Sequence, residues 1–144
     1  MYNVPGRTGV DIPVSVYRKL STIDNIAGVK EASSDITKIT KIKCACHPDF
    51  GLWSGNDDQI VPVMSLGGDG VISVLSNVVP VQTQAMVNAA IAGDFDTAAA
   101  LQCRLQPLIE LLFCEVNPIP VKTAMRLIGY DCGSCRLPLT DLPP

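Results

Sequence analysis

The chain has 144 residues, of which 47% are hydrophobic and 17% charged, a composition that suits one compact domain and argues against disorder. Its net charge is −3, and Lys and Arg are scattered along the chain, so no basic surface for binding nucleic acid or an anionic membrane is expected. Neither an apolar run near the ~20 residues of a membrane span nor a signal-peptide pattern at Met1–Pro5 is present, so we expect a cytoplasmic protein.

The first third of the chain alternates between helical and strand patterns. Val14, Tyr17 and Leu20 recur on one face and predict a helix over 13–21. A short apolar run, 26–29, predicts a buried strand that leads directly into Lys30. Ser34 and Asp35 are good helix N-caps, and the apolar spacing that follows them predicts a helix to about residue 46.

The same alternation continues through the middle of the chain. We expect strands at 50–53 and 71–74 and a helix at 59–66 between them. Strands that alternate with helices in this way indicate a parallel α/β sheet with right-handed crossovers. Three such strands do not close a barrel, so their outer edges would need another partner.

The remaining residues are predicted to be mainly helical. One helix is expected from 80 to 92, with Gly93 ending it. A second helix is expected at 95–113, with a kink or break at Pro107. A rigid loop at 117–120 would precede a last helix that ends near 128, and the proline-rich tail, 137–144, is expected to be extended.

Five short motifs carry a resemblance to a known family. Their order and spacing resemble dihydrodipicolinate synthase, and the resemblance covers nearly the whole chain. The motifs are Tyr2-Asn3-Val4-Pro5-Gly6-Arg7-Thr8-Gly9, Gly28-Val29-Lys30-Glu31-Ala32, Ser54-Gly55-Asn56-Asp57, Gly67-Gly68-Asp69-Gly70-Val71-Ile72-Ser73-Val74 and Asn117-Pro118-Ile119-Pro120-Val121-Lys122.

The resemblance implies a fold larger than this chain can form. The family has a (β/α)8 TIM barrel followed by a helical C-terminal domain. By resemblance, this chain is a partial barrel that runs from the end of strand five through strand eight and its helix. We therefore expect a partial barrel at 1–93, a C-terminal helical domain at 94–144, and truncation by about half.

Lys30 is the predicted catalytic residue. A lysine at the carboxyl end of a strand lies on the catalytic face of a TIM barrel. Burial would favour its neutral amine, which can attack a ketone and form an imine. The resemblance implies that this ketone is pyruvate, whose imine becomes an enamine, a carbon nucleophile. From the local residues alone, a solvated lysine at a strand end is the favoured alternative.

The resemblance implies roles for four more residues. Tyr2 would relay protons, as a phenol both donates and accepts, although a packing tyrosine is the simpler interpretation of that residue alone. Arg7 would bind the carboxylate of aspartate semialdehyde through its planar fork, the alternative being a surface arginine. Gly55 and Ile72 would line the pyruvate pocket, and a core role for Ile72 is an equal alternative. The threonine and the partner-subunit tyrosine of the relay lie outside this chain.

Six cysteines leave two minor alternatives open. Cys44-Ala45-Cys46-His47 and Cys132-Gly133-Ser134-Cys135 could together form a zinc site, and the second motif could be a redox pair. The second motif follows a helix rather than opening one, so the usual activation of a thiolate is missing. We expect reduced thiols, no metal site and no cofactor.

The leading functional hypothesis is a Schiff-base lyase that condenses pyruvate with L-aspartate 4-semialdehyde in lysine (diaminopimelate) biosynthesis, and that needs the missing N-terminal half. The expected partners are these two substrates, with a homo-oligomer or a complementing N-terminal half. One alternative is an inactive remnant or a split-barrel subunit. Another is a different pyruvate-lysine class I aldolase, such as a sugar-acid lyase, against which Arg7 argues.

Overall fold

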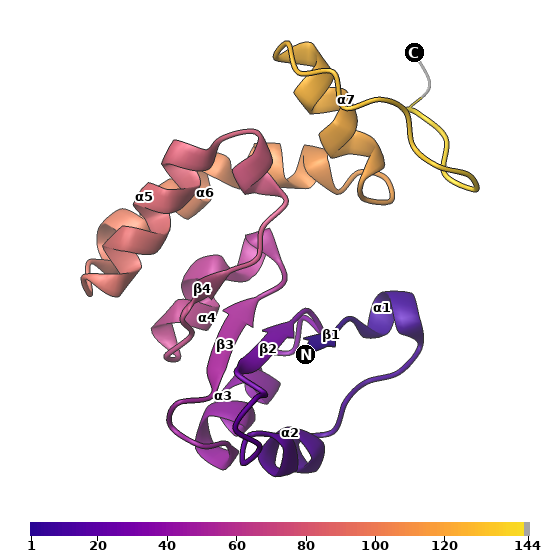
Figure 1. The fold of residues 1–144 in the computed structure, drawn as a ribbon. Coiled ribbons are helices and arrows are strands. Elements are labelled where there is room, and N and C mark those ends of the chain that lie inside the picture. The colour runs from indigo at the N-terminus through magenta and orange to yellow at the C-terminus, as the bar shows by residue number, and fades with distance from the viewer. Residues whose placement is uncertain (143–144) are drawn as a thin grey trace.

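Four short parallel strands form the centre of the molecule in the computed structural model, which describes residues 1–142 (Figure 1). The strands follow chain order in the sheet, β1-β2-β3-β4. Their register places Tyr2 beside Lys30, Lys30 beside Trp53 and Trp53 beside Gly70. The bounds are β1 Tyr2–Asn3, β2 Gly28–Glu31, β3 Gly51–Ser54 and β4 Gly70–Val71.

Seven α-helices and two 3-10 turns connect and extend the strands within residues 1–142. Their bounds are α1 Pro5–Thr8, α2 Val14–Leu20, α3 Ile36–Ala45, η1 Asp57–Gln59, α4 Ile60–Ser65, η2 Leu75–Asn77, α5 Pro80–Ile91, α6 Phe95–Leu112 and α7 Ile119–Leu127. In the same part of the chain, no helix is both long and apolar enough to cross a membrane.

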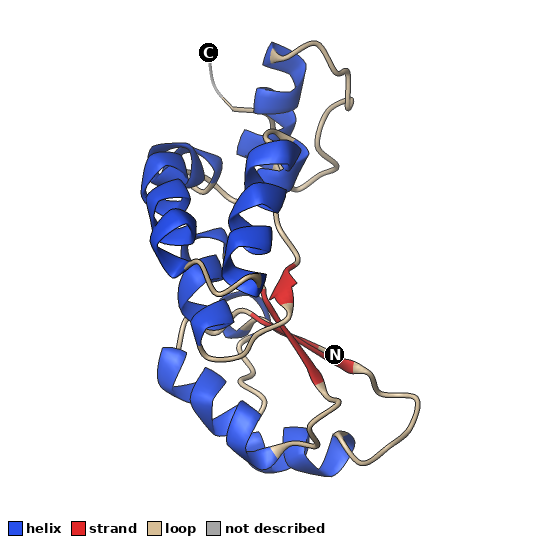
Figure 2. Ribbon diagram, turned by 90° about the vertical axis from the view of Figure 1, so that its left-hand side faces the viewer, coloured by secondary structure: helices blue, strands red, loops and turns tan. Residues whose placement is uncertain are grey.

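Helices cover one face of the sheet. Val29 and Leu52 point from β2 and β3 into a core that also holds Tyr17, Ile39 and Val63. Those three residues come from α2, α3 and α4, so alternate strand residues are buried against three helices. Figure 2 shows the helices that follow β2, β3 and β4 gathered on one side of the strands. The helices of residues 1–142 leave the opposite face, which carries Tyr2 and Lys30, open.

A second core joins the sheet region to the C-terminal helices. It contains Ile60 and Met64 of α4, Met86 of α5, and Leu105 and Ile109 of α6, among other residues. Helices α5 and α6 lie side by side as a hairpin (Figure 1). The hairpin packs on α4, so this core contains residues from both sides of position 93, where the sequence predicts a domain boundary.

Several predictions from local sequence are confirmed. Asp35 caps α3, and its carboxylate accepts a hydrogen bond from Lys38 N at 3.1 Å. Gly93 ends α5 in the left-handed region with φ of 79°, a conformation that favours glycine. Tyr17 is fully buried on the predicted face of α2. The parallel α/β class is likewise as expected.

Other predictions need correction. The strand predicted at 26–29 is displaced to 28–31, so Lys30 lies within it and not after it. The strand at 71–74 is shorter than predicted, since Asp57 accepts hydrogen bonds from the Val74 and Leu75 backbone N–H groups and turns the chain away. Only three strands were expected from apolar runs, whereas β1 forms a fourth strand.

The C-terminal helices also differ from expectation. Helix α6 continues through Pro107 without a break, because its apolar face is buried on both sides of the proline, at Leu105 and Ile109. Helix α7 begins at Ile119, inside the predicted loop, and ends at Leu127, near the predicted limit. Residues 143–144 of the predicted extended tail lie outside the described part of the chain.

Candidate active site

Lys30 lies on the open face of the sheet, next to Tyr2. The two residues are partners in the β1–β2 ladder, and both side chains therefore leave the sheet on the same side. Lys30 Nζ lies 4.4 Å from the centroid of the Tyr2 ring. The lysine is half-buried, so the sheet and the ring shield part of its side chain from water.

A cavity of about 360 Å3 opens beside this lysine. Trp53 comes from the neighbouring strand β3, and Ile72 follows β4; both line the cavity together with Lys30. The Ile72 side chain is 48% exposed and belongs to neither core, which favours its interpretation as a contact residue over a core residue. Its backbone N–H donates to Ser54 O at 2.9 Å, which fixes it at the carboxyl end of β3.

Gly55 follows β3 at the same end of the sheet. A Cβ atom added there would lie 2.6 Å from Ala32 Cβ and 3.1 Å from Lys30 Cε. The 2.6 Å approach to Ala32 Cβ leaves no room for a side chain at Gly55, and Lys30 Cε would also have to move slightly. The sequence predicted close approach of a ligand at this glycine, and the structure shows close approach of the lysine itself.

Tyr2 contacts the lysine through the face of its ring. An ammonium over an aromatic face makes a cation–π contact. The ring is 47% exposed, and within residues 1–142 its hydroxyl makes no hydrogen bond to another group. The predicted proton relay would therefore need a movement of the ring or a bound molecule to bring the hydroxyl to the reacting atoms.

Arg7 lies on α1, which begins just after the carboxyl end of β1. Its side chain is exposed, and within the described residues no hydrogen bond or ion pair involves its guanidinium. Gly9 ends this single-turn helix with φ of 68° and donates to Pro5 O at 2.9 Å. The arginine thus follows the carboxyl end of β1, the strand that pairs with the Lys30 strand, and it lies on a separate short helix.

Sequence reasoning missed the contribution of Trp53. Its ring covers β2 and β3 at their amino ends, where a Cβ atom added to Gly28 would lie 2.6 Å from Trp53 Cζ3. The signal was available, because Gly28 and Gly51 are glycines at paired positions of adjacent strands. Glycines inside strands indicate close approach by another group, here the indole.

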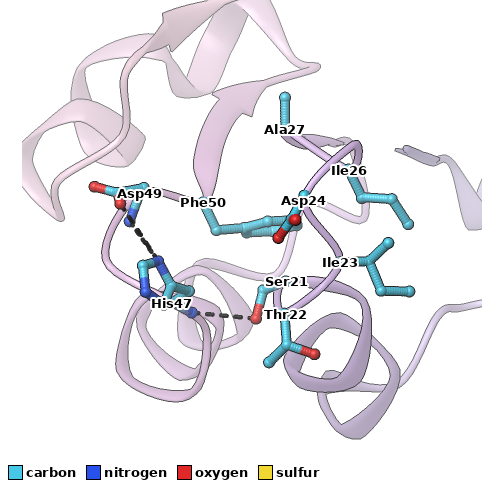
Figure 3. Close-up of a pocket in the computed structure, with 9 residues that line it drawn as sticks. All are labelled: Ser21, Thr22, Ile23, Asp24, Ile26, Ala27, His47, Asp49 and Phe50. Carbon is cyan, nitrogen blue, oxygen red and sulfur yellow. Dashed lines mark hydrogen bonds and ion pairs between the residues drawn. The ribbon is translucent and has the colours of Figure 1, made fainter.

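A different pocket, of about 400 Å3, opens at the opposite end of the sheet (Figure 3). It is lined by the segments that precede β2 and β3, and it contains His47, the only histidine of the chain. The Oγ of Ser21 accepts from the His47 backbone N–H at 3.1 Å, and His47 Nδ1 accepts from Asp49 N at 3.3 Å. No hydrogen bond joins the serine hydroxyl to the imidazole, so these side chains form no nucleophile–base pair.

The cysteine motifs do not converge in the structure. All six thiols are free, and among residues 1–142 no three His, Cys, Asp or Glu side chains are grouped to hold a metal ion. Burial raises the pKa of the Cys46 thiol, which disfavours its thiolate.

Comparisons with known proteins agree on one family. The Dihydrodipicolinate synthetase family matches residues 1–143. A 4-hydroxy-tetrahydrodipicolinate synthase from Caldicellulosiruptor saccharolyticus is 50% identical over 142 residues, which are 99% of this chain and 48% of that protein. The chain belongs to this family, and it spans about half the length of the curated relatives that it matches.

Solved structures agree with that assignment. The dihydrodipicolinate synthase from Aquifex aeolicus superposes with a TM-score of 0.96 at 40% identity, over 99% of this chain and 49% of that one. A chloride-inhibited dihydrodipicolinate synthase from Acinetobacter baumannii, complexed with pyruvate, gives a TM-score of 0.94 at 40% identity, over the same shares. The four-stranded fold described above is therefore shared with one half of these proteins.

Proposed function

We propose that this chain carries the imine-forming lysine of a dihydrodipicolinate synthase-type lyase, with Lys30 as the residue that binds pyruvate. The observation that carries the proposal is the contact of Lys30 Nζ with the Tyr2 ring, 4.4 Å from its centroid, beside an open cavity. Family membership supports it, as does the relative that is complexed with pyruvate.

The proposed chemistry begins with the neutral amine of Lys30. Its nitrogen attacks the ketone carbon of pyruvate and forms a carbinolamine, which loses water to give an imine. Loss of a methyl proton converts the imine into an enamine. The enamine carbon then attacks the aldehyde carbon of L-aspartate 4-semialdehyde and forms the new carbon–carbon bond, in the pathway to lysine.

The other residues take supporting roles in this proposal. The Tyr2 hydroxyl carries protons to and from the carbinolamine, after a small rotation of its exposed ring. The free Arg7 guanidinium binds the carboxylate of the second substrate in a bidentate manner. Ile72 and Gly55 border the space that pyruvate occupies. Gly55 contributes because it has no side chain that would crowd Lys30.

The proposed setting is the second part of a TIM barrel. Strands β1 to β4 would be the end of strand five and strands six to eight, in residues 1–93, with a helical domain in 94–144. The open face and the two sheet edges would be covered by the N-terminal half that the relatives have, either in the same polypeptide or as a complementing partner. We also expect a homo-oligomer and a cytoplasmic location.

Reduction with borohydride in the presence of labelled pyruvate tests the proposal. The chain is treated alone and after mixing with the N-terminal half of the Caldicellulosiruptor relative, which lacks a match in this chain. Peptide mass spectrometry should place the adduct on Lys30, and Lys30→Arg should abolish it. Lys38→Arg is the matched control, since that buried lysine is already paired with Asp11. The absence of an adduct in both preparations would refute the proposal.

The same preparations distinguish the alternatives. A split-barrel subunit would form the adduct only with the N-terminal half present, and an inactive remnant would form none under either condition. A sugar-acid lyase would turn over a sugar-acid substrate in preference to aspartate semialdehyde. In that case Arg7→Ala would leave turnover unchanged, whereas we expect it to raise KM for aspartate semialdehyde.

A further inference from the structure

A buried polar cluster lies behind Lys30 and Tyr2, on the helix-covered face of the sheet. It consists of Asn3, Glu31 and Tyr17, which are 1%, 2% and 0% exposed. The cluster joins β1, β2 and α2, and none of its side chains reaches the open face. Ionic and polar groups are costly to bury, so a cluster of this kind in place of apolar residues calls for a reason.

Every acceptor in the cluster is satisfied. Asn3 Nδ2 donates to both Glu31 oxygens, at 2.8 and 3.1 Å. The Tyr17 hydroxyl donates to Glu31 Oε2 at 2.8 Å, and the Ser33 backbone N–H donates to Glu31 Oε1 at 2.8 Å. All these groups donate to the carboxylate, which fits its ionised form, since an ionised carboxylate only accepts. Burial and the carboxylate together raise the pKa of Tyr17, so its hydroxyl remains a donor.

The cluster also reaches the segment that follows Arg7. Asn3 Nδ2 donates to Asp11 Oδ1 at 2.9 Å, and Asn3 Oδ1 accepts from Ile12 N at 3.1 Å. Asp11 in turn is paired with Lys38 of α3, whose Nζ lies 5.6 Å from the Tyr17 ring centroid. One asparagine side chain thus connects β1, β2 and the chain that returns from α1.

The position of the cluster determines which face Tyr2 occupies. Asn3 and Glu31 are ladder partners, and Tyr2 and Lys30 are the partners one residue earlier. Strand β1 has two residues and few backbone bonds to β2, among them Lys30 N to Met1 O and Ala32 N to Asn3 O, both at 2.9 Å. A slip of one residue would move Tyr2 to the opposite face. The Asn3–Glu31 hydrogen bonds oppose that slip.

We infer that Glu31, through Asn3 and Tyr17, is a positioning residue that holds the Tyr2 ring against Lys30 from the opposite face of the sheet. This inference rests on the proposed function for its catalytic meaning, but the geometry can be tested without catalysis. The Glu31 carboxylate makes no hydrogen bond to Lys30, and its effect passes through the register of β1.

The first test is an NMR measurement on the Lys30 ε-methylene group. The Tyr2 ring lies 4.4 Å from Nζ, the atom bonded to this methylene carbon, and a ring face so near shifts these protons upfield. Tyr2→Leu defines the signal without the ring. Glu31→Gln places an amide N–H against the donors of the cluster, and we expect the Lys30 signal to move most of the way to its Tyr2→Leu position. Glu115→Gln, at an exposed glutamate, is the matched control and should leave the signal unchanged.

The second test is kinetic. Glu31→Gln should slow borohydride-trapped imine formation on the order of tenfold. It should add nothing in a Tyr2→Phe background, because that background already lacks the hydroxyl whose placement depends on the position of the ring. Additive effects of the two substitutions, in contrast, would indicate a general loss of structure and overturn the inference.

The outcomes separate the inference from the proposed function. If the unsubstituted protein forms no adduct either alone or with the N-terminal half, the proposed function fails, and the NMR signal still decides the positioning role. If Glu31→Gln does not fold, Tyr17→Phe removes one donor and leaves the carboxylate paired with Asn3; it should shift the Lys30 signal part of the way. If Glu31→Gln folds and its Lys30 signal is unchanged, the inference is overturned. If only Tyr17→Phe can be measured, an unchanged Lys30 signal in that variant overturns it.

Discussion

Gly55 faces the Lys30 side chain at the carboxyl ends of β3 and β2, where a single methyl group on Gly55 would come within 3.1 Å of Lys30 Cε. That distance is shorter than an ordinary carbon–carbon contact, and the added methyl would also press on Ala32 Cβ, at 2.6 Å. The path of the lysine side chain therefore depends on a residue that carries no functional group.

Gly55→Ala should displace the Lys30 side chain. We expect a destabilisation of about 1–3 kcal/mol from overpacking, together with a large loss of pyruvate trapping on Lys30. Thermal unfolding and adduct yield measure the two effects. Gly6→Ala is the control, because a Cβ at Gly6 has nothing within 4 Å, and it should preserve the melting temperature. Equal trapping in Gly55→Ala and the unsubstituted protein would contradict the packing argument.

Asp57 should matter for stability and its neighbour Asp58 should not. Asp57 is buried and its Oδ2 accepts from Val74 N at 3.0 Å and Leu75 N at 2.8 Å. Asp57→Ala leaves the buried Leu75 N–H and the partly buried Val74 N–H unpaired, and we expect it to cost about 2–4 kcal/mol in denaturant unfolding. Asp58→Ala, at an exposed side chain, should change stability by less than about 0.5 kcal/mol. Equal losses in the two variants would show that these hydrogen bonds are unimportant.

The Asp11–Lys38 pair should produce an acid-dependent stability difference. The hydrogen bond from Lys38, then that from Asn3, lowers the pKa of Asp11 below its ordinary value of 3.8. A lowered folded-state pKa contributes stability above the unfolded-state pKa, and that contribution is lost as pH falls through the folded-state pKa. The melting temperature of the unsubstituted protein should therefore exceed that of Asp11→Asn at about pH 5, and the gap should narrow by about pH 2. A gap that does not change with pH would contradict this assignment.

The two neighbouring thiols of α3 and its C-cap should react at different rates. Burial raises the pKa of Cys46, whereas Cys44 is exposed. Because the thiolate is the nucleophile, we expect iodoacetamide to modify Cys44 faster than Cys46 in the folded protein, with the difference lost in denaturant. Peptide mass spectrometry over time measures both rates, and faster modification of Cys46 would reverse the expected order.

Local features of the sequence predicted the parts of the fold that local forces determine. The Asp35 cap, the Tyr17 face of α2 and the Gly93 terminator each depend on residues within one or two helical turns. Strand β1 could not be predicted from periodicity, because two residues are too few to show an alternation. It forms because β2 provides hydrogen-bond partners for Met1 and Asn3.

The site likewise combines features that the sequence predicted with contacts that depend on distant residues. The resemblance between motifs assigned Lys30 and Tyr2 to one site, and the structure places the two residues side by side. The Asn3–Glu31 hydrogen bond joins residues that are 28 positions apart, and no local sequence pattern predicts it. The approach of Gly55 to Lys30 depends likewise on the crossover through α3 that sets β2 and β3 side by side. These contacts follow from the fold and not from any single segment.

The central claim is that Lys30 captures pyruvate as an imine, and a crystal structure of the protein grown with pyruvate, with the relative's N-terminal half added where needed, tests it most directly. The account predicts continuous electron density between Lys30 Nζ and the former ketone carbon of pyruvate, beside the Tyr2 ring. Pyruvate bound elsewhere, or a free amine at Lys30 under saturating pyruvate, would contradict it.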